Sequence, residues 1–280
     1  MNKKTNNRIF KIPELSYLEL KYSNTFFECS QKHYHNMLCI LGLKKGRAKI
    51  IINDEEIVLN EKKLVVINPN EVHYSISDEI TQDYYVVYID RTWYQNLQKH
   101  IFKIEQLISL PNEIVDLDIC ASFFDLFEYL YENNDVIEKE EKLFEFLKHI
   151  LNNAFFDNRI LEVNKTTQIA KEFKEYIENN ISSKLTLTQI SNALGYSPYH
   201  IIRICNQNFG LSANAYIVNK RVHRAKKLIC DGIDISQAAR EVGFYDQSHL
   251  TNVFKKVFAL TPKAYQNDIQ NSITRESNNE

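Results

Sequence analysis

The sequence has no long hydrophobic run. None of its apolar stretches approaches the roughly 20 residues that a membrane-spanning helix requires. Residues 1–6 are polar and contain no apolar core of the kind found in secretion signals. We therefore expect a cytoplasmic protein that has no membrane partner.

Cysteine is scarce and irregularly placed. None of the five cysteines stands in a C-x-x-C pair. They are Cys29, Cys39, Cys120, Cys205 and Cys230. Because disulfide frameworks and zinc ribbons depend on paired cysteines, we expect neither. The remaining composition, 44% hydrophobic and 25% charged over 280 residues, is that of a soluble globular protein with room for two domains.

The chain has only a small net charge, but its acidic and basic residues are unevenly distributed along the sequence. The formal net charge is −2. Residues 165–270 contain 14 basic and 8 acidic side chains, whereas residues 1–164 contain 19 basic and 26 acidic ones. A basic C-terminal third indicates that this part of the chain meets a polyanion such as nucleic acid.

Short β-strands are expected in the first domain, which we place at residues 1–110. Runs rich in β-branched and aromatic residues recur at 48–52, 63–67 and 84–89. The turns between strands are Asn53-Asp54 and Asn68-Pro69-Asn70. Regularly spaced short strands favour a small barrel or sandwich.

Residues 111–160 are expected to form a helical hairpin. Apolar residues recur there at helical spacing in two stripes, which the polar stretch 132–141 separates. The first stripe is Ile119, Phe123, Leu126, Phe127 and Leu130, and the second is Leu143, Phe146, Leu147, Ile150 and Leu151. The hairpin either makes a homodimer interface or packs against its own barrel, and the pattern favours neither. Residues 158–165 are predicted to be a linker.

The third region, residues 165–270, contains an internal repeat of a helix pair. The stretch 187–196 resembles 235–244, which lies 48 residues later. Beyond the glycines the offset is 49, so that Ile201 matches Leu250. The apolar register is kept on both sides of this one-residue slip, which indicates two copies of one structural unit.

Each copy carries the start and stop signals of two helices. The candidate N-caps are Thr186 (with Gln189), Ser197 (before Pro198), Asp234 (with Gln237) and Asp246. Gly195 and Gly243 can take the left-handed conformation that ends a helix in a tight turn. A helix, a glycine turn and a second capped helix form a helix-turn-helix, although a plain helical bundle is the alternative. A helix from Ser212 to about Leu228, roughly 25 Å long, would hold the two units about one DNA turn apart.

The chain resembles the AraC/XylS family of transcriptional regulators over residues 170–266. The resemblance rests on the stretch GFYDQSHLTNVFKKVF at 243–258, on Leu260-Thr261-Pro262 with Tyr265, on 197–203, and on Arg221, Ala225 and Leu228. It implies two helix-turn-helix units in adjacent major-groove segments of double-stranded DNA. It also implies contact with RNA polymerase and, as the usual mode, activation of transcription.

The resemblance identifies the DNA-facing residues of the first recognition helix. Tyr199, Ile202 and Arg203 occupy the face that family members turn toward bases. Arg203 can bind guanine O6 and N7 with two hydrogen bonds, although a phosphate contact is the alternative. His200 meets either a base or only the backbone.

In the second recognition helix, Gln247, Ser248 and Asn252 occupy the corresponding face. Asn252 stands where arginine is common in the family, and asparagine prefers adenine. We therefore expect the second half-site to be rich in A·T pairs or weakly read. Lys255 and Lys256 are expected to contact phosphates, which position the protein without specifying sequence.

The N-terminal domain resembles a cupin barrel. His33 and His35 form an H-x-H pair, and Gly46 and His73 follow, but Cys39 stands where metal-binding cupins have glutamate. Because a 2-His-1-carboxylate site needs that carboxylate, we expect no metal, no cofactor and no catalytic residue.

We interpret the barrel as a pocket for a small-molecule effector, with Tyr17, Phe27, His35 and His73 as wall residues. Two alternatives stay open: a cupin metalloenzyme with an appended DNA-binding region, and a barrel that only dimerises or binds a partner protein. Taken together, the sequence predicts an α+β protein. It would contain a cupin-like barrel, a helical linker and an all-α domain of two helix-turn-helix units.

Overall fold

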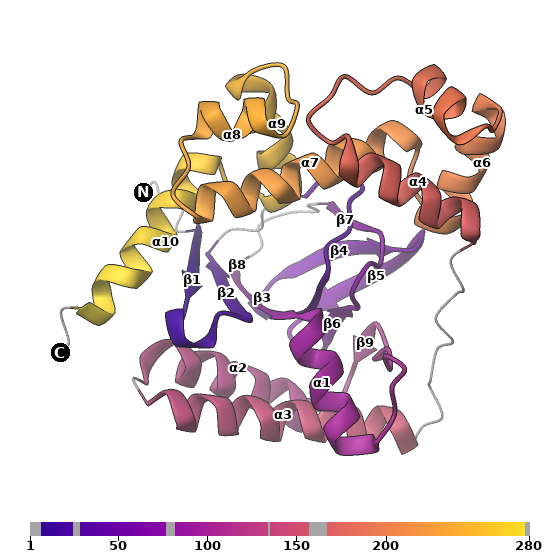
Figure 1. Cartoon of the computed structure of the whole chain (residues 1–280). Helices are drawn as coiled ribbons and strands as arrows, with labels where there is room; N and C mark the ends of the chain where they lie inside the picture. Colours follow the sequence, from indigo (N-terminus) through magenta and orange to yellow (C-terminus); the bar gives the residue numbers. More distant parts are fainter. Residues whose placement is uncertain (1–6, 25–28, 77–81, 134, 157–166, 278–280) are drawn as a thin grey trace.

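The protein has three layers (Figure 1), seen in a computed structural model that describes residues 7–24, 29–76, 82–133, 135–156 and 167–277. Two β-sheets form the middle layer. A helical pair covers one side of them, and the C-terminal helices cover the other. The predicted linker at 158–165 lies outside the described residues.

The larger sheet has six antiparallel strands in the order β1-β2-β8-β3-β6-β9. They are β1 (Asn7–Lys11), β2 (Leu18–Ser23), β8 (Gln82–Asp90), β3 (Met37–Lys45), β6 (Leu64–Ile67) and β9 (Glu113–Ile114). In β3 both faces are buried, because Ile40 packs toward the helical pair and Leu41 toward the smaller sheet. This double burial explains why β3 is a continuous apolar run and does not alternate with polar residues.

The smaller sheet has three strands in the order β5-β4-β7. They are β5 (Glu55–Asn60), β4 (Arg47–Ile52) and β7 (His73–Ile76). Asn53 and Asp54 both have positive φ, at 50° and 70°, and form the two-residue connection between β4 and β5. Asparagine and aspartate tolerate this conformation in hairpin turns, so the predicted turn is confirmed.

The predicted hairpin consists of α2 (Leu117–Glu132) and α3 (Val136–Phe156). Its two apolar stripes belong to the same core as the six-stranded sheet, so these faces pack on their own barrel and are not free for a dimer. Helix α3 begins at Val136, so its first turn lies within the polar stretch 132–141. Close packing also explains Gly42 in β3, where an added Cβ would lie 2.8 Å from Phe123.

Two elements of the N-terminal domain were not predicted from the sequence. Strand β1 pairs with β2 and contacts the C-terminal helix. Helix α1 (Arg91–Phe102) begins directly after β8, where the Asp90 side chain accepts a hydrogen bond of 2.8 Å from Thr92 N. Because no loop separates β8 from α1, the sequence has no turn residues there that would mark the change from strand to helix.

The C-terminal domain contains seven helices among its described residues. They are α4 (Gln168–Asn179), α5 (Leu187–Leu194), α6 (Pro198–Phe209), α7 (Ala213–Cys230), α8 (Ile235–Glu241), α9 (Gln247–Phe258) and α10 (Pro262–Ser277). Helix α7 joins two separate cores: Tyr216 packs with α4–α6, and Val222 packs with α8–α10. The predicted connecting helix is thereby confirmed.

The predicted turn and cap signals are largely confirmed. Gly195 ends α5 with a φ of 73°, and Thr186 forms a complete capping box with Gln189. Asp234 caps α8, but its predicted partner Gln237 bonds to Glu241 instead, so the reciprocal half of the second box was wrong. Within the described ranges, no helix is long and apolar enough to cross a membrane.

Candidate DNA-binding surface and ligand cavity

The first recognition helix, α6, separates an apolar face from a polar one. Ser197 caps it by accepting a hydrogen bond from His200 N at 3.3 Å. Ile201, Ile204 and Cys205 face the core, as the repeat predicts. The opposite face exposes the predicted contact residues Tyr199, Ile202 and Arg203, with the Tyr199 side chain 75% exposed.

His200 is half-buried and lies against its neighbours. Its ring stacks on Tyr196 with centroids 5.5 Å apart. Arg203 Nη2 lies 3.4 Å from His200 Nδ1. This contact limits the orientations of the arginine, so His200 can position Arg203 even where it does not itself reach a base.

The second recognition helix, α9, repeats this arrangement. Asp246 caps it by accepting a hydrogen bond of 2.7 Å from His249 N. Its core face is Leu250, Val253, Phe254 and Val257. All five predicted DNA-contact residues are exposed: Gln247, Ser248, Asn252, Lys255 and Lys256.

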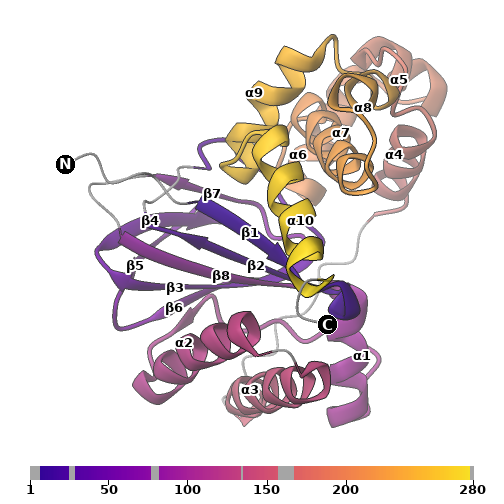
Figure 2. The same ribbon diagram turned by 90° about the vertical axis from the view of Figure 1, so that its left-hand side faces the viewer.

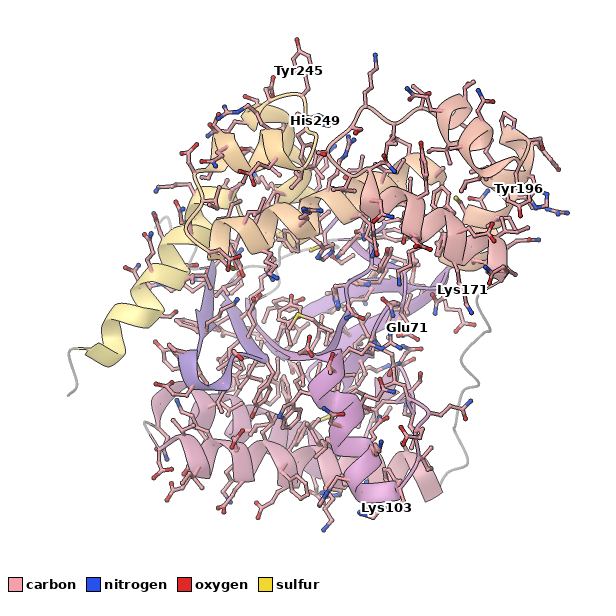
Figure 3. All side chains as sticks on the ribbon, in the orientation of Figure 1. Glu71, Lys103, Lys171, Tyr196, Tyr245 and His249 are labelled. Carbon is pink, nitrogen blue, oxygen red and sulfur yellow. The ribbon has the colours of Figure 1, made fainter. Side chains whose placement is uncertain are left out.

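Tyr245 is an exposed aromatic residue that the sequence analysis did not select. It precedes α9, is 91% exposed, and points away from the body of the protein, next to His249 (Figure 3). It lies in the quoted family stretch, at the turn before the recognition helix. From this position in the sequence, Tyr245 could have been predicted to lie on the same surface as the recognition helix.

The two units are held in a fixed relation by α7. Arg221 Nε donates a hydrogen bond of 3.0 Å to Ile181 O, just after the end of α4. A Cβ on Gly243 would lie 2.9 Å from the Arg221 guanidinium and from two backbone oxygens, so the second turn must be glycine. Helices α6 and α9 lie on one side of α7, and α4 and α5 lie on the other (Figure 2).

A cavity of about 700 Å³ lies between the barrel and the C-terminal domain. One wall comes from β1–β4 and β6–β8, and the other from α7, α9 and α10. Met37, Leu41, Ile50, Ile67, Val257 and Phe258 form much of its apolar lining. The volume is within the range of small-molecule sites.

Three histidines of the barrel line this cavity together with His223 of α7. The ring of His73 lies 4.2 Å from that of His33 and 4.8 Å from that of His35, centre to centre. Each ring places Nδ1 within hydrogen-bond distance of a backbone carbonyl. Burial lowers the pKa of His33 to about 4 and that of His223 to about 3, and holds those of His35 and His73 well below the usual value.

Only some of the residues predicted to line an effector pocket line the cavity of the structure. His35 and His73 line it, and Phe27 lies outside the described residues. Tyr17 does not line it: the ring stacks on Trp93 at 4.3 Å, and the hydroxyl donates to Glu140. Tyr17 lies in the turn before β2, so the alternation of the strand does not extend to it. Among the described residues, no three histidine, cysteine, aspartate or glutamate side chains form a group that could hold a metal ion.

The charged residues of the cavity wall were not predicted. Glu19 Oε1 accepts a hydrogen bond of 2.9 Å from Lys226 Nζ, and Oε2 accepts one of 3.1 Å from the Tyr265 hydroxyl. Burial alone would raise the pKa of Glu19, but Lys226 and Lys11 overcome it and lower the pKa below its usual value. Burial lowers the pKa of Lys21, whose Nζ donates to Phe258 O at 3.1 Å.

These features define a DNA-binding protein that has a ligand-binding domain. A family model described as an AraC-like ligand binding domain matches residues 13–147, and one described as a helix-turn-helix domain matches residues 190–268. The multiple antibiotic resistance protein MarA of Escherichia coli is 33% identical over 93 residues, which are 33% of this chain and 73% of MarA. The transcriptional regulator YbfI of Bacillus subtilis is 26% identical over 220 residues, 78% of this chain and 80% of that protein.

Solved structures share the whole fold. ToxT from Vibrio cholerae aligns with a TM-score of 0.61 at 14% identity, over 97% of this chain and 98% of ToxT. The chain belongs to the AraC/XylS family of transcriptional regulators. It is a helix-turn-helix DNA-binding regulator with a ligand-binding N-terminal domain.

Proposed function

We propose that the effector of this regulator binds in the cavity between the barrel and the DNA-binding domain, and that it is an amphipathic carboxylic acid. The observation that carries the proposal is the composition of the wall. An apolar lining adjoins the buried ammonium group of Lys21 and the partly buried one of Lys226. ToxT has been solved with an unsaturated fatty acid and with (E)-4-(8-methylnaphthalen-1-yl)but-3-enoic acid, both apolar molecules with one carboxylate.

Sequence reading is assigned mainly to the first unit. Arg203 binds a guanine, with Tyr199 and Ile202 beside it and His200 holding the arginine. In the second unit Gln247, Ser248 and Asn252 face bases, and Lys255 and Lys256 contact phosphates. The exposure of these side chains on one face of each recognition helix supports this assignment.

The regulator works in the cytoplasm as a homodimer that contacts RNA polymerase and activates transcription. Because the apolar stripes of α2 and α3 are buried in their own core, a dimer would use other surfaces. We assign no catalytic activity to the barrel. At the position where metal-binding cupins have glutamate, the Cys39 thiol is buried in an apolar core, and this burial raises its pKa well above the usual value.

A thermal-denaturation series with matched probes tests the ligand class. Oleate carries the carboxylate, and oleyl alcohol has the same chain without the charge. A ligand that binds only the folded state raises stability by mass action, by about 2.7 kcal/mol at a hundredfold excess over Kd. We expect stabilisation by oleate alone in the full-length protein. Equal stabilisation by both probes would contradict the proposal that the ligand needs a carboxylate. Stabilisation by neither probe would contradict this whole class of ligand.

A further inference from the structure

Strand β2 presents two different faces to the protein. Leu18 and Leu20 belong to the core shared with α2 and α3. Because successive side chains of a strand point to opposite faces, Glu19 and Lys21 face the C-terminal domain. They are only 4% and 3% exposed, and both line the cavity. Charged side chains this deeply buried require partners, and here the partners come from the DNA-binding domain.

Glu19 connects β2 to the two helices that support the second recognition helix. Its carboxylate accepts hydrogen bonds from Lys226 of α7 and from Tyr265 of α10. The Lys226 ammonium also lies over the rings of Phe258 and Tyr265, 5.1 and 5.0 Å from their centres. Phe258 is the last residue of α9. One barrel carboxylate therefore holds a cluster that includes the end of the recognition helix.

Lys21 contacts α9 itself. Its Nζ donates a hydrogen bond of 3.1 Å to the carbonyl oxygen of Phe258. The last carbonyl groups of a helix have no partner within the helix and carry the negative end of its dipole, so a cation there is favourable. A residue of the ligand-binding domain thus caps the second recognition helix at its C-terminus, from inside the cavity.

We propose that Glu19 and Lys21 form a latch that couples the effector cavity to the second helix-turn-helix unit. An effector carboxylate would replace Glu19 on Lys226 and draw Lys21 away from the Phe258 carbonyl, which releases α9 from the barrel. The identity of the ligand rests on the proposed function above; the latch itself rests on the contacts of β2. Four lysines, Lys11, Lys21, Lys226 and Lys227, line the cavity against three carboxylates, those of Glu19, Asp90 and Asp231, so a further carboxylate can enter.

Amide hydrogen exchange in the full-length protein without added ligand tests the latch. Glu19→Gln and Lys21→Met should each speed exchange of peptides covering residues 254–265 by about tenfold, the effect of losing one hydrogen bond to a charged group. Peptides of α5 and α6 should keep their rates. Glu14→Gln is the matched control, because it removes an exposed carboxylate from the segment just before β2.

A double variant protects the test against misfolding. Glu19→Gln alone leaves the partly buried Lys226 without its carboxylate, whereas Glu19→Gln with Lys226→Met removes both charges. Loosening of residues 254–265 in the double variant, with unchanged helix content, supports the latch. Wild-type exchange in both the double variant and Lys21→Met would overturn it, whatever oleate does.

Adding oleate to the wild-type protein separates the latch from the ligand class. Faster exchange of residues 254–265 with oleate, and not with oleyl alcohol, supports release by a carboxylate. If oleate stabilises the protein against heat but slows exchange there, the cavity ligand stands and the release is overturned. If oleate does not stabilise the protein while the variants still loosen α9, the latch is supported and the proposed ligand class is wrong.

Discussion

The two helix-turn-helix units have the same order of helices and turns. They differ in the side chains that their recognition helices expose and in their contacts with the barrel. With the 49-residue offset, Arg203 of the first unit corresponds to Asn252 of the second. Gln207, on the exposed side of α6, corresponds to Lys256. The first unit therefore exposes an arginine at this position, whereas the second exposes an amide there and an additional positive charge one turn later.

The contacts that the two units make with the barrel also differ. Around the first unit, Tyr34 packs into the core, and its carbonyl accepts a hydrogen bond from Asn219. Around the second, β1 and β2 contribute hydrogen bonds from several residues. Asn7 donates to Ala259 O, Ile9 N to Asp268, Lys11 to Cys230 and Lys21 to Phe258 O, whereas Glu19 accepts from Lys226 and Tyr265. This asymmetry is consistent with the two proposals above, in which the first unit is the main reader of sequence and the second unit responds to the cavity.

The largest expected difference is in the free energy of unfolding that is lost when a core residue of each unit is truncated. Phe254 corresponds to Cys205, and both side chains are fully buried. Phe254 contacts the rings of Phe258 and Tyr265, so Phe254→Ala should cost about 3–5 kcal/mol of unfolding free energy. Cys205→Ala removes one atom and should cost about 1 kcal/mol. Urea denaturation followed by circular dichroism measures both, and equal losses would contradict the larger contribution of Phe254 to its core.

Acid should weaken the contact between barrel and second unit. Burial lowers the pKa of His33 to about 4 and of His223, which contacts Phe258, to about 3. Because the unfolded state binds protons more readily, stability is complete above about pH 6.5 and falls by up to roughly 1.4 kcal/mol per pH unit for each such histidine. Thermal melting at pH 7.5 and 5.5 measures the loss. His33→Gln should reduce it, and an unchanged pH dependence would refute this cause.

Operator affinity should depend on the two recognition helices unequally. Arg203→Ala removes a bidentate base contact worth about 1–3 kcal/mol and should lower affinity more than tenfold, with unchanged helix content. Asn252→Ala should lower it less, because an uncharged amide makes a weaker contact than an arginine and we propose that sequence is read mainly by the first unit. Mobility-shift titration on a selected operator compares them. Equal binding by Arg203→Ala and the wild type would refute the assignment of Arg203.

The smallest expected effect concerns the helix ends. Gly210 ends α6 and Ala259 ends α9, both in the left-handed conformation, with φ of 61° and 59°. Because only glycine adopts this conformation without strain, Ala259→Gly should stabilise the protein by about 1 kcal/mol. Gly210→Ala should destabilise it, since the new Cβ would also lie 3.2 Å from Val72. Thermal denaturation of the two variants should show shifts of opposite sign, and shifts of the same sign would contradict this explanation.

Local signals predicted much of the DNA-binding domain. Caps and glycines act over one helical turn, so Thr186, Ser197 and Gly195 had their expected roles. The reciprocal bond of Gln237 failed because Glu241, one turn away, competes for the same amide. The repeat also predicted which faces of α6 and α9 are buried, because the same apolar spacing occurs twice.

The cavity could not be predicted in the same way. Its walls combine β2 with helices more than 200 residues later, and no local pattern records that contact. Tyr17 was selected because it is aromatic and near a strand, yet it packs against Trp93. The alternating charges Glu19 and Lys21 in a strand with buried leucines were the one available signal, since buried charges need distant partners.

Footprinting of the full-length protein on a selected operator tests most directly whether two similar units bind one duplex. Guanine-methylation and hydroxyl-radical footprints should show two protected major-groove segments on the same face, about 10 base pairs apart. Arg203→Ala should remove the base contacts of one segment and leave the other. A single protected segment, or two on opposite faces of the duplex, would contradict the account.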